Sequence, residues 1–127
     1  MGKRLVIIED EADIVELVRY NFQKEGFEVR SFTRGKEGLE DLRRNSADLV
    51  ILDIMLPDID GFEVCRRLKA HEQTRSVPVV MLTALSQEEN RRKGMECGAV
   101  DYMVKPFDPD KLMATIRAHA NVHSMKH

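Results

Sequence analysis

Cysteine is scarce in this chain of 127 residues, which contains two cysteines, Cys65 and Cys97. They lie far apart in the sequence and form no CxxC pair of the kind found in redox and zinc sites. Two cysteines are also too few for the disulfide framework of a small secreted domain. We therefore predict two buried or half-buried free thiols in a reducing, cytoplasmic compartment.

The chain also lacks an excess of one charge and lacks a long apolar run. Its formal net charge is -2, which gives no electrostatic footprint for nucleic acid. No apolar run approaches the length that spans a membrane, and the start MGKRLVIIEDE is too short and too acidic for a signal peptide. Position 6 is valine, so the myristoylation pattern also fails. We expect no membrane association and no direct nucleic acid binding.

What is present is an ordinary globular composition, with 43% hydrophobic and 33% charged residues. Such a composition excludes disorder, and the length suits one domain that buries roughly two-thirds of its unfolded surface. We expect one domain over residues 1–127, with a core at 1–123 and a frayed tail at 124–127. Apolar runs predict five strands at residues 4–8, 27–32, 49–53, 79–83 and 100–104.

Helix signals separate these strands. Gly26 is a C-terminal stop, and Asp60 with Glu63 forms an acidic capping box. Ser86 with Glu89 forms a second capping box, and Asp108 precedes a proline at the first turn of the last helix. Residues 86–97 carry almost no apolar stripe, so we expect a weakly packed, movable helix there.

Strands and helices thus alternate five times, which predicts a doubly wound (βα)5 fold with a parallel sheet and helices on both faces. Ligands of such sheets bind beyond the carboxyl ends of the strands. The first strand ends in Glu9-Asp10, the third in Asp53, the fourth in Thr83 and the fifth in Lys105. An acidic, oxygen-rich site without histidine or cysteine suits Mg²⁺. A carboxylate nucleophile, a cation, a hydroxyl and a lysine can together accept a phosphoryl group.

These residues, in this order, resemble the receiver domain of two-component response regulators over essentially the whole chain. The matching motifs are IIEDE, LVILDIMLPDIDG, VVMLTA and DYMVKPF. The resemblance implies a flavodoxin-like fold with strand order 2-1-3-4-5. It also implies phosphorylation of an aspartate by a phosphohistidine of a sensor histidine kinase or a phosphotransfer protein.

Each motif residue takes a role from that resemblance. Asp53 would be the phosphoacceptor, and Thr83, Lys105 and the backbone N–H of Ala84 would hold the phosphoryl oxygens. Tyr102 would be the switch aromatic, and the bond from Lys105 to Pro106 would be cis. The resemblance implies Mg²⁺, with Mn²⁺ as a substitute, bound by Asp10, Asp53, the Met55 carbonyl and Glu9, the last directly or through water.

The resemblance also implies a signalling module rather than an enzyme with external substrates. The face built from the fourth helix, fifth strand and fifth helix would contact an effector domain, a downstream protein or a second copy. Apolar Met55 and Leu85, two residues beyond Asp53 and Thr83, predict slow self-dephosphorylation. Receivers on winged-helix transcription factors pair through this face with acidic and basic residues; Arg91, Glu96 and Asp101 fit that pattern, whereas Val100, Lys111 and Thr115 depart from it.

Rival hypotheses fit the residues less well. An aspartate-nucleophile phosphohydrolase of the haloacid dehalogenase type needs an acid two residues after the nucleophile, where this chain has Met55. A nucleotide-binding module would need a Walker A or GxGxxG run, and neither occurs. Asp58-Ile59-Asp60-Gly61 fails as a calcium loop because Leu56 would be its first ligand. His119, His123 and His127 share a four-residue spacing but lack further zinc ligands, so we expect solvated histidines.

Overall fold

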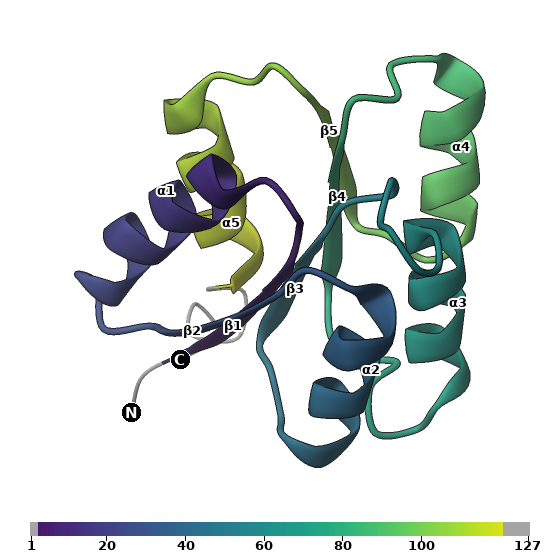
Figure 1. The fold of residues 1–127 in the computed structure, drawn as a ribbon, viewed down its shortest axis with the longest axis horizontal. Coiled ribbons are helices and arrows are strands. Elements are labelled where there is room, and N and C mark those ends of the chain that lie inside the picture. Colours follow the sequence, from purple (N-terminus) through teal and green to yellow (C-terminus); the bar gives the residue numbers. More distant parts are fainter. Residues whose placement is uncertain (1–2, 121–127) are drawn as a thin grey trace.

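The computed structural model of the protein describes residues 3–120 and consists of a parallel sheet between two helical layers (Figure 1). The sheet has the order β2-β1-β3-β4-β5, and each neighbouring pair of strands is parallel. This order and the five alternating units confirm the predicted flavodoxin-like fold. The strands are β1 (Arg4–Ile8), β2 (Glu28–Phe32), β3 (Leu49–Leu52), β4 (Val79–Thr83) and β5 (Asp101–Val104).

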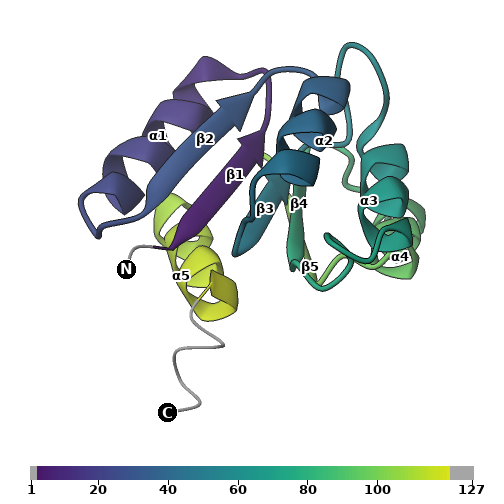
Figure 2. The ribbon, with the colours of Figure 1, turned by 90° about the horizontal axis from the view of Figure 1, so that it is seen from below.

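Helices cover both faces of the sheet, as Figures 1 and 2 show. One layer holds α1 and α5, and the other holds α2, α3 and α4. Because every crossover between parallel strands needs such a helix, the loops after the strands gather at one edge of the sheet. The helices are α1 (Ala12–Gln23), α2 (Gly35–Arg44), α3 (Gly61–Ala70), α4 (Glu88–Glu96) and α5 (Pro109–Ala120).

The central strands supply the core on both sides of the sheet. In β1, Leu5 and Ile7 pack toward α1 and α5, whereas Val6 and Ile8 pack toward α2 and α3. All four side chains are fully buried. Burying each contributes roughly 1.5–3 kcal/mol, which explains why an uninterrupted apolar run forms a strand here.

The predicted helix ends are partly right. The Asp60 carboxylate accepts a hydrogen bond from the Glu63 N–H at 2.9 Å, and Asp108 accepts one from the Asp110 N–H at 3.0 Å. Gly26 adopts a φ of 90° after α1, as a C-terminal stop requires. The capping box at Ser86 is wrong, because α4 begins at Glu88 with Gln87 at its N-cap and no side-chain cap.

The N-terminus of α2 is capped by Asp58, a residue distant in sequence. Its carboxylate accepts hydrogen bonds from the backbone N–H groups of Gly35 at 2.8 Å and Lys36 at 2.9 Å. Burial opposes ionisation, but the backbone N–H donors together outweigh it and lower the pKa of Asp58 to about 2. The loop that follows β3 is therefore tied to α2.

Strands β2, β3 and β5 are each one residue shorter than predicted.

Other predictions concern the C-terminal end of the chain. His123, His127 and the expected tail at 124–127 lie outside the described residues, so those expectations stay predictions. His119 Nε2 lies 3.3 Å from Asp101 Oδ2, and about one-quarter of the His119 side chain is exposed, so this histidine is less solvated than predicted. Between residues 3 and 120, no helix has both the length and the apolar character needed to cross a bilayer.

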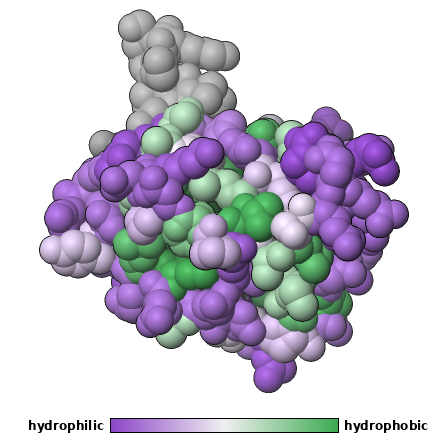
Figure 3. All heavy atoms as spheres, turned by 90° about the horizontal axis from the view of Figure 1, so that it is seen from above, coloured by the Kyte–Doolittle hydropathy of each residue, from purple (hydrophilic) through white to green (hydrophobic). Residues whose placement is uncertain are grey.

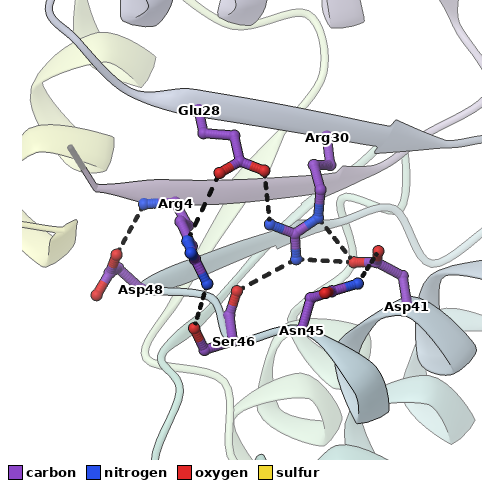
Figure 4. Close-up of polar contacts among 7 residues, drawn as sticks. All are labelled: Arg4, Glu28, Arg30, Asp41, Asn45, Ser46 and Asp48. Atoms are coloured by element: carbon purple, nitrogen blue, oxygen red, sulfur yellow. Dashed lines mark hydrogen bonds and ion pairs between the residues drawn. The ribbon is translucent and has the colours of Figure 1, made fainter. Parts of the chain in front are cut away.

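A polar network joins the amino-terminal ends of β1 and β2 to α2 and the loop that follows it (Figure 4). We call it the amino-edge network. The Arg30 guanidinium donates to Asp41 Oδ2 from Nε at 2.9 Å and from Nη2 at 2.8 Å. Both side chains are less than one-fifth exposed, so this pair fastens β2 to α2. The network contains Arg4, Glu28, Arg30, Asp41, Asn45, Ser46 and Asp48.

Candidate functional site

Three acidic side chains meet at the carboxyl edge of the sheet. Glu9 and Asp10 directly follow β1, and Asp53 directly follows the neighbouring strand β3. One carboxylate oxygen from each residue lies within 4.8 Å of the others. Glu9 and Asp53 are buried, whereas Asp10 is exposed to solvent. The predicted convergence of these acids is confirmed, and their spacing fits one divalent cation.

The loop after β3 is shaped by Gly61. The Gly61 N–H donates to the Ile54 carbonyl at 2.8 Å, so the chain folds back on itself just after Asp53. A Cβ atom at position 61 would lie 2.4 Å from the Asp53 carbonyl oxygen and 2.7 Å from Ile54 Cα. Since both atoms belong to the backbone, neither could yield without moving Asp53. Gly61 therefore holds Asp53 in place by being small.

Lys105 follows β5 and reaches across to the acids. Its ammonium lies 3.0 Å from Asp53 Oδ2, 3.0 Å from Glu9 Oε1 and 2.5 Å from Glu11 Oε1. Burial alone would lower the pKa of Lys105, but hydrogen bonds to Glu11, Asp53 and Glu9 outweigh burial and raise it. Lys105 is therefore a fixed positive charge beside Asp53. The Lys105-Pro106 peptide bond is cis, as the resemblance implied.

The single positive charge of Lys105 does not balance the negative charges of the acids around it. Burial, together with the charge of Asp53, raises the pKa of Glu9 to about 7. Glu9 Oε1 lies near the ammonium, yet it is the one buried side-chain oxygen within residues 3–120 that accepts no hydrogen bond. A buried carboxylate oxygen that accepts no hydrogen bond is costly. The acids are therefore arranged to receive a further cation.

Thr83 and Tyr102 lie next to this cluster on β4 and β5. Thr83 is fully buried, and its hydroxyl accepts a hydrogen bond from the Leu85 N–H at 3.3 Å. The Tyr102 hydroxyl donates to the Leu85 carbonyl at 2.7 Å, so both side chains contact the loop between β4 and α4. A pocket that includes Lys105 and Glu11 is also lined by Ala84. The predicted site residues therefore gather in adjoining loops.

The Tyr102 ring packs against α4 through Gly94. A Cβ atom at position 94 would lie 3.1 Å from Tyr102 Cδ2 and 2.8 Å from Met81 Sδ. Gly94 is the buried residue of α4, and most of the other residues of this helix are charged and exposed. The prediction of a weakly packed fourth helix is confirmed. Its mobility stays a prediction.

The mouth of the site is apolar on one side. Met55 is 57% exposed and shares a pocket with Asp10, Leu85 and Lys93. Seen from above, the surface of the molecule also shows apolar patches between hydrophilic side chains (Figure 3). The two residues expected to flank the path of hydrolytic water therefore line one pocket, next to an acid of the cluster.

The two cysteines lie outside the acidic cluster, whereas Glu11 contacts the site. Cys65 and Cys97 are free thiols, as predicted, and burial raises the pKa of Cys65 to about 11. Neither belongs to the acidic cluster. Glu11 does contact the site, through Lys105, and sequence reasoning missed it. The available signal was its place directly after Glu9-Asp10, in a run of three acids.

Comparison with known families agrees with this geometry. The family model described as "Response regulator receiver domain" matches residues 5–117. The phosphate regulon transcriptional regulatory protein PhoB of Rhizobium meliloti is 44% identical over 93% of this chain and 52% of its own length. The alkaline phosphatase synthesis transcriptional regulatory protein PhoP of Bacillus subtilis is 40% identical over 93% of this chain and 48% of its own. The chain thus spans about half the length of these relatives.

Solved structures are similar as well. The BeF3-activated N-terminal receiver domain of Klebsiella pneumoniae RstA superposes with a TM-score of 0.83 at 35% identity, covering 93% of this chain and 98% of that one. A CheY-like receiver domain protein of Methanospirillum hungatei reaches a TM-score of 0.88 at 28% identity, with complete coverage of both chains. These matches do not favour the haloacid dehalogenase alternative. The chain belongs to the receiver domain family of two-component response regulators.

Proposed function

We propose that Asp53 is the residue that accepts the phosphoryl group in this receiver domain. The observation that carries the proposal is the position of Asp53, whose carboxylate lies 3.0 Å from the Lys105 ammonium and within the acidic cluster. A carboxylate oxygen of Asp53 attacks phosphorus, and the bond from phosphorus to the donor's imidazole nitrogen breaks. The donor is the phosphohistidine of a sensor histidine kinase or of a phosphotransfer protein.

Mg²⁺ is the cation that the site fits best, and Mn²⁺ can substitute for it. Asp10, Asp53 and the Met55 carbonyl would hold the ion, and Glu9 would contact it directly or through a water. The buried Glu9 oxygen that accepts no hydrogen bond supports this assignment. A receiver domain of histidine kinase PA1611 from Pseudomonas aeruginosa, 25% identical, is described with a magnesium ion coordinated in its active site cleft. When bound, the ion neutralises charge on the acceptor and on the incoming phosphoryl group.

The transferred group would be held by three donors around Asp53. The Lys105 ammonium, the Thr83 hydroxyl and the Ala84 N–H would each donate to a phosphoryl oxygen. Thr83 is the last residue of β4, and Ala84 and Lys105 directly follow β4 and β5, so all three lie at the same sheet edge as Asp53. The phosphoryl group adds about -1.5 to -2 units of charge, so it attracts the lysine and the hydroxyl.

Phosphorylation would act on the surface through Thr83 and Tyr102. Drawing Thr83 toward the phosphoryl group moves the loop whose Leu85 is bonded to both side chains. Tyr102 then leaves the Leu85 carbonyl and turns inward, which rearranges the α4–β5–α5 face. Only Gly94 of α4 is buried, so a small change can shift this helix between two populations.

The α4–β5–α5 face would carry the signal to a cytoplasmic effector domain, a downstream protein or a phosphorylated second copy. These relatives are named as transcriptional regulators, and the chain covers about half of their length. The domain itself would act on no external substrate and would bind no nucleic acid. Lys111 and Thr115 line the pocket on this face, so the departures from the expected pairing residues lie on the surface that would have to pair.

The experiment compares the wild-type domain with Asp53→Asn after incubation with acetyl phosphate and Mg²⁺. Intact mass should show a single phosphoryl group on the wild type and none on the variant. A variant phosphorylated at the wild-type rate would show that Asp53 is not the acceptor. Rapid turnover of acetyl phosphate without a stable adduct would instead indicate a hydrolase.

Slow loss of the phosphoryl group follows from the apolar pocket beside the acceptor. Met55 and Leu85 line that pocket and offer no polar atom from their side chains to orient water. Replacing both residues with asparagine should increase the rate of self-dephosphorylation, measured as the decay of the phosphorylated mass. An unchanged rate would remove the support for water exclusion.

A further inference from the structure

We propose that Glu11 is a positioning residue that holds the Lys105 ammonium when a cation occupies the acidic cluster, and that releases it to the phosphoryl group. The inference rests on the proposed function of Asp53. Of the three carboxylates around Lys105, Glu11 makes the shortest contact, at 2.5 Å. The two residues are 94 positions apart, so this ion pair connects the start of α1 to the loop after β5.

The backbone setting of Glu11 leaves its side chain free for this contact. Glu11 is the N-cap residue of α1, a position where a side chain commonly accepts hydrogen bonds from the first helical turn. The Glu11 side chain makes no such bond and extends instead to Lys105. The Glu11 backbone N–H donates to Glu9 Oε2 at 3.1 Å, which fixes Glu11 to the buried acid. The contact therefore starts from a well-anchored backbone.

Glu11 lies outside the set of acids that could ligate the cation. The carboxylate oxygens that come within 4.8 Å of one another belong to Glu9, Asp10 and Asp53. A cation bound there takes over oxygens that the lysine now shares at Asp53 and Glu9. Lys105 then needs another anion, and Glu11 is already in contact with it. Glu11 is also 57% exposed, so it can give up the lysine at little desolvation cost.

This arrangement predicts that removing the Glu11 charge has opposite effects on the binding of a cation and of an anionic phosphoryl mimic. Removing the Glu11 charge takes away the alternative partner of Lys105 and a nearby negative charge, and both changes weaken cation binding. The same removal frees Lys105 and lessens the repulsion of an anion, so an anionic phosphoryl mimic binds more tightly. If the contact between Glu11 and Lys105 had a purely structural role, its loss would weaken the binding of both ligands.

The test uses Glu11→Gln, with Asp13→Asn as the matched control. Asp13 is exposed and lies in the first turn of α1, and it forms no hydrogen bond or ion pair with Lys105. Calorimetry measures the Mg²⁺ dissociation constant, and amide NMR titration at saturating Mg²⁺ measures binding of BeF3. Glu11→Gln should raise the first constant and lower the second, each by about twofold to fivefold. Glu11→Asp, which keeps the charge, should fall between wild type and Glu11→Gln.

Several outcomes would overturn the inference. They are unchanged constants in Glu11→Gln, shifts of both constants in the same direction, or equal shifts in Asp13→Asn. The Asp53→Asn variant separates this result from the proposed function. If wild type and Asp53→Asn take up phosphoryl groups equally, the proposed function fails, and this inference fails with it. If only the Glu11 results disagree, the acceptor assignment stands.

Discussion

The amino and carboxyl edges of the sheet carry charged clusters of opposite character. At the amino ends, Arg4 and Arg30 pair with acids on the neighbouring strand, on α2 and in the following loop (Figure 4). At the carboxyl ends, Lys105 alone faces Glu9, Glu11 and Asp53. The first cluster satisfies its members, whereas the second leaves a buried Glu9 oxygen without a hydrogen bond.

This difference separates charges that support the fold from charges that support function. A network whose donors and acceptors are matched can fasten a strand to a helix and needs no ligand. A cluster with surplus buried negative charge is destabilising in isolation, and a bound cation offsets that cost. Mutations should therefore have opposite consequences at the two edges.

The largest expected effect is at the carboxyl edge, in Glu9→Gln. The Mg²⁺ dissociation constant should rise by about a hundredfold, because an acid of the metal cluster is lost. The metal-free variant should nevertheless be more stable than wild type at pH 8, by on the order of 1 kcal/mol, since a buried charge is removed. Calorimetry and urea unfolding measure the two effects. A less stable variant would show that Glu9 serves the fold.

At the amino edge, Arg30→Ala should do the reverse. Asp41 would lose both hydrogen bonds from Arg30 while only 13% of its side chain is exposed. The free energy of unfolding should fall by about 2 kcal/mol, between the values for exposed and buried pairs. Mg²⁺ affinity should stay within about twofold of wild type. A large loss of Mg²⁺ affinity in a folded variant would erase the distinction between the edges.

A smaller effect is expected for Asp58→Ala, which removes the cap of α2. Loss of an N-cap costs about 1 kcal/mol of unfolding free energy at pH 7. The folded pKa of Asp58 is lowered from 3.8 to about 2, so its contribution is present above pH 3.8 and is lost as pH falls toward 2. Urea unfolding of both proteins across that range should show the stability difference shrinking. A difference independent of pH would contradict the capping role.

Much of the site could be predicted because strand ends are visible in sequence. LVII, LVIL and VVML are apolar runs, so the polar residues that follow them had to lie at one edge of a parallel sheet. The strand order and the role of each motif residue came from the family resemblance, because periodicity alone does not fix which strands are neighbours. Two adjacent acids in a sequence do not show which one is buried, so the burial of Glu9 and the exposure of Asp10 could not be predicted.

The remaining contacts join residues distant in sequence, and no local pattern encodes them. Asp58 caps a helix that begins 23 residues earlier, and Glu11 pairs with a lysine 94 residues later. Each depends on how helices pack on the sheet, which composition and spacing do not specify. The error at Ser86 is of another kind. The predicted N-cap, Ser86, lies one residue before the observed N-cap, Gln87, and such a shift is within the usual ambiguity of helix ends.

The most direct test of the account is the effect of Mg²⁺ on unfolding of the wild type and of Asp10→Asn. Asp10 is exposed, so its substitution should change metal-free stability little while removing a ligand. We predict that the unfolding temperature of the wild type rises with Mg²⁺ concentration and that the variant responds much less at the same concentrations. Equal stabilisation of both proteins, or none in the wild type, would contradict a cation site at the carboxyl edge.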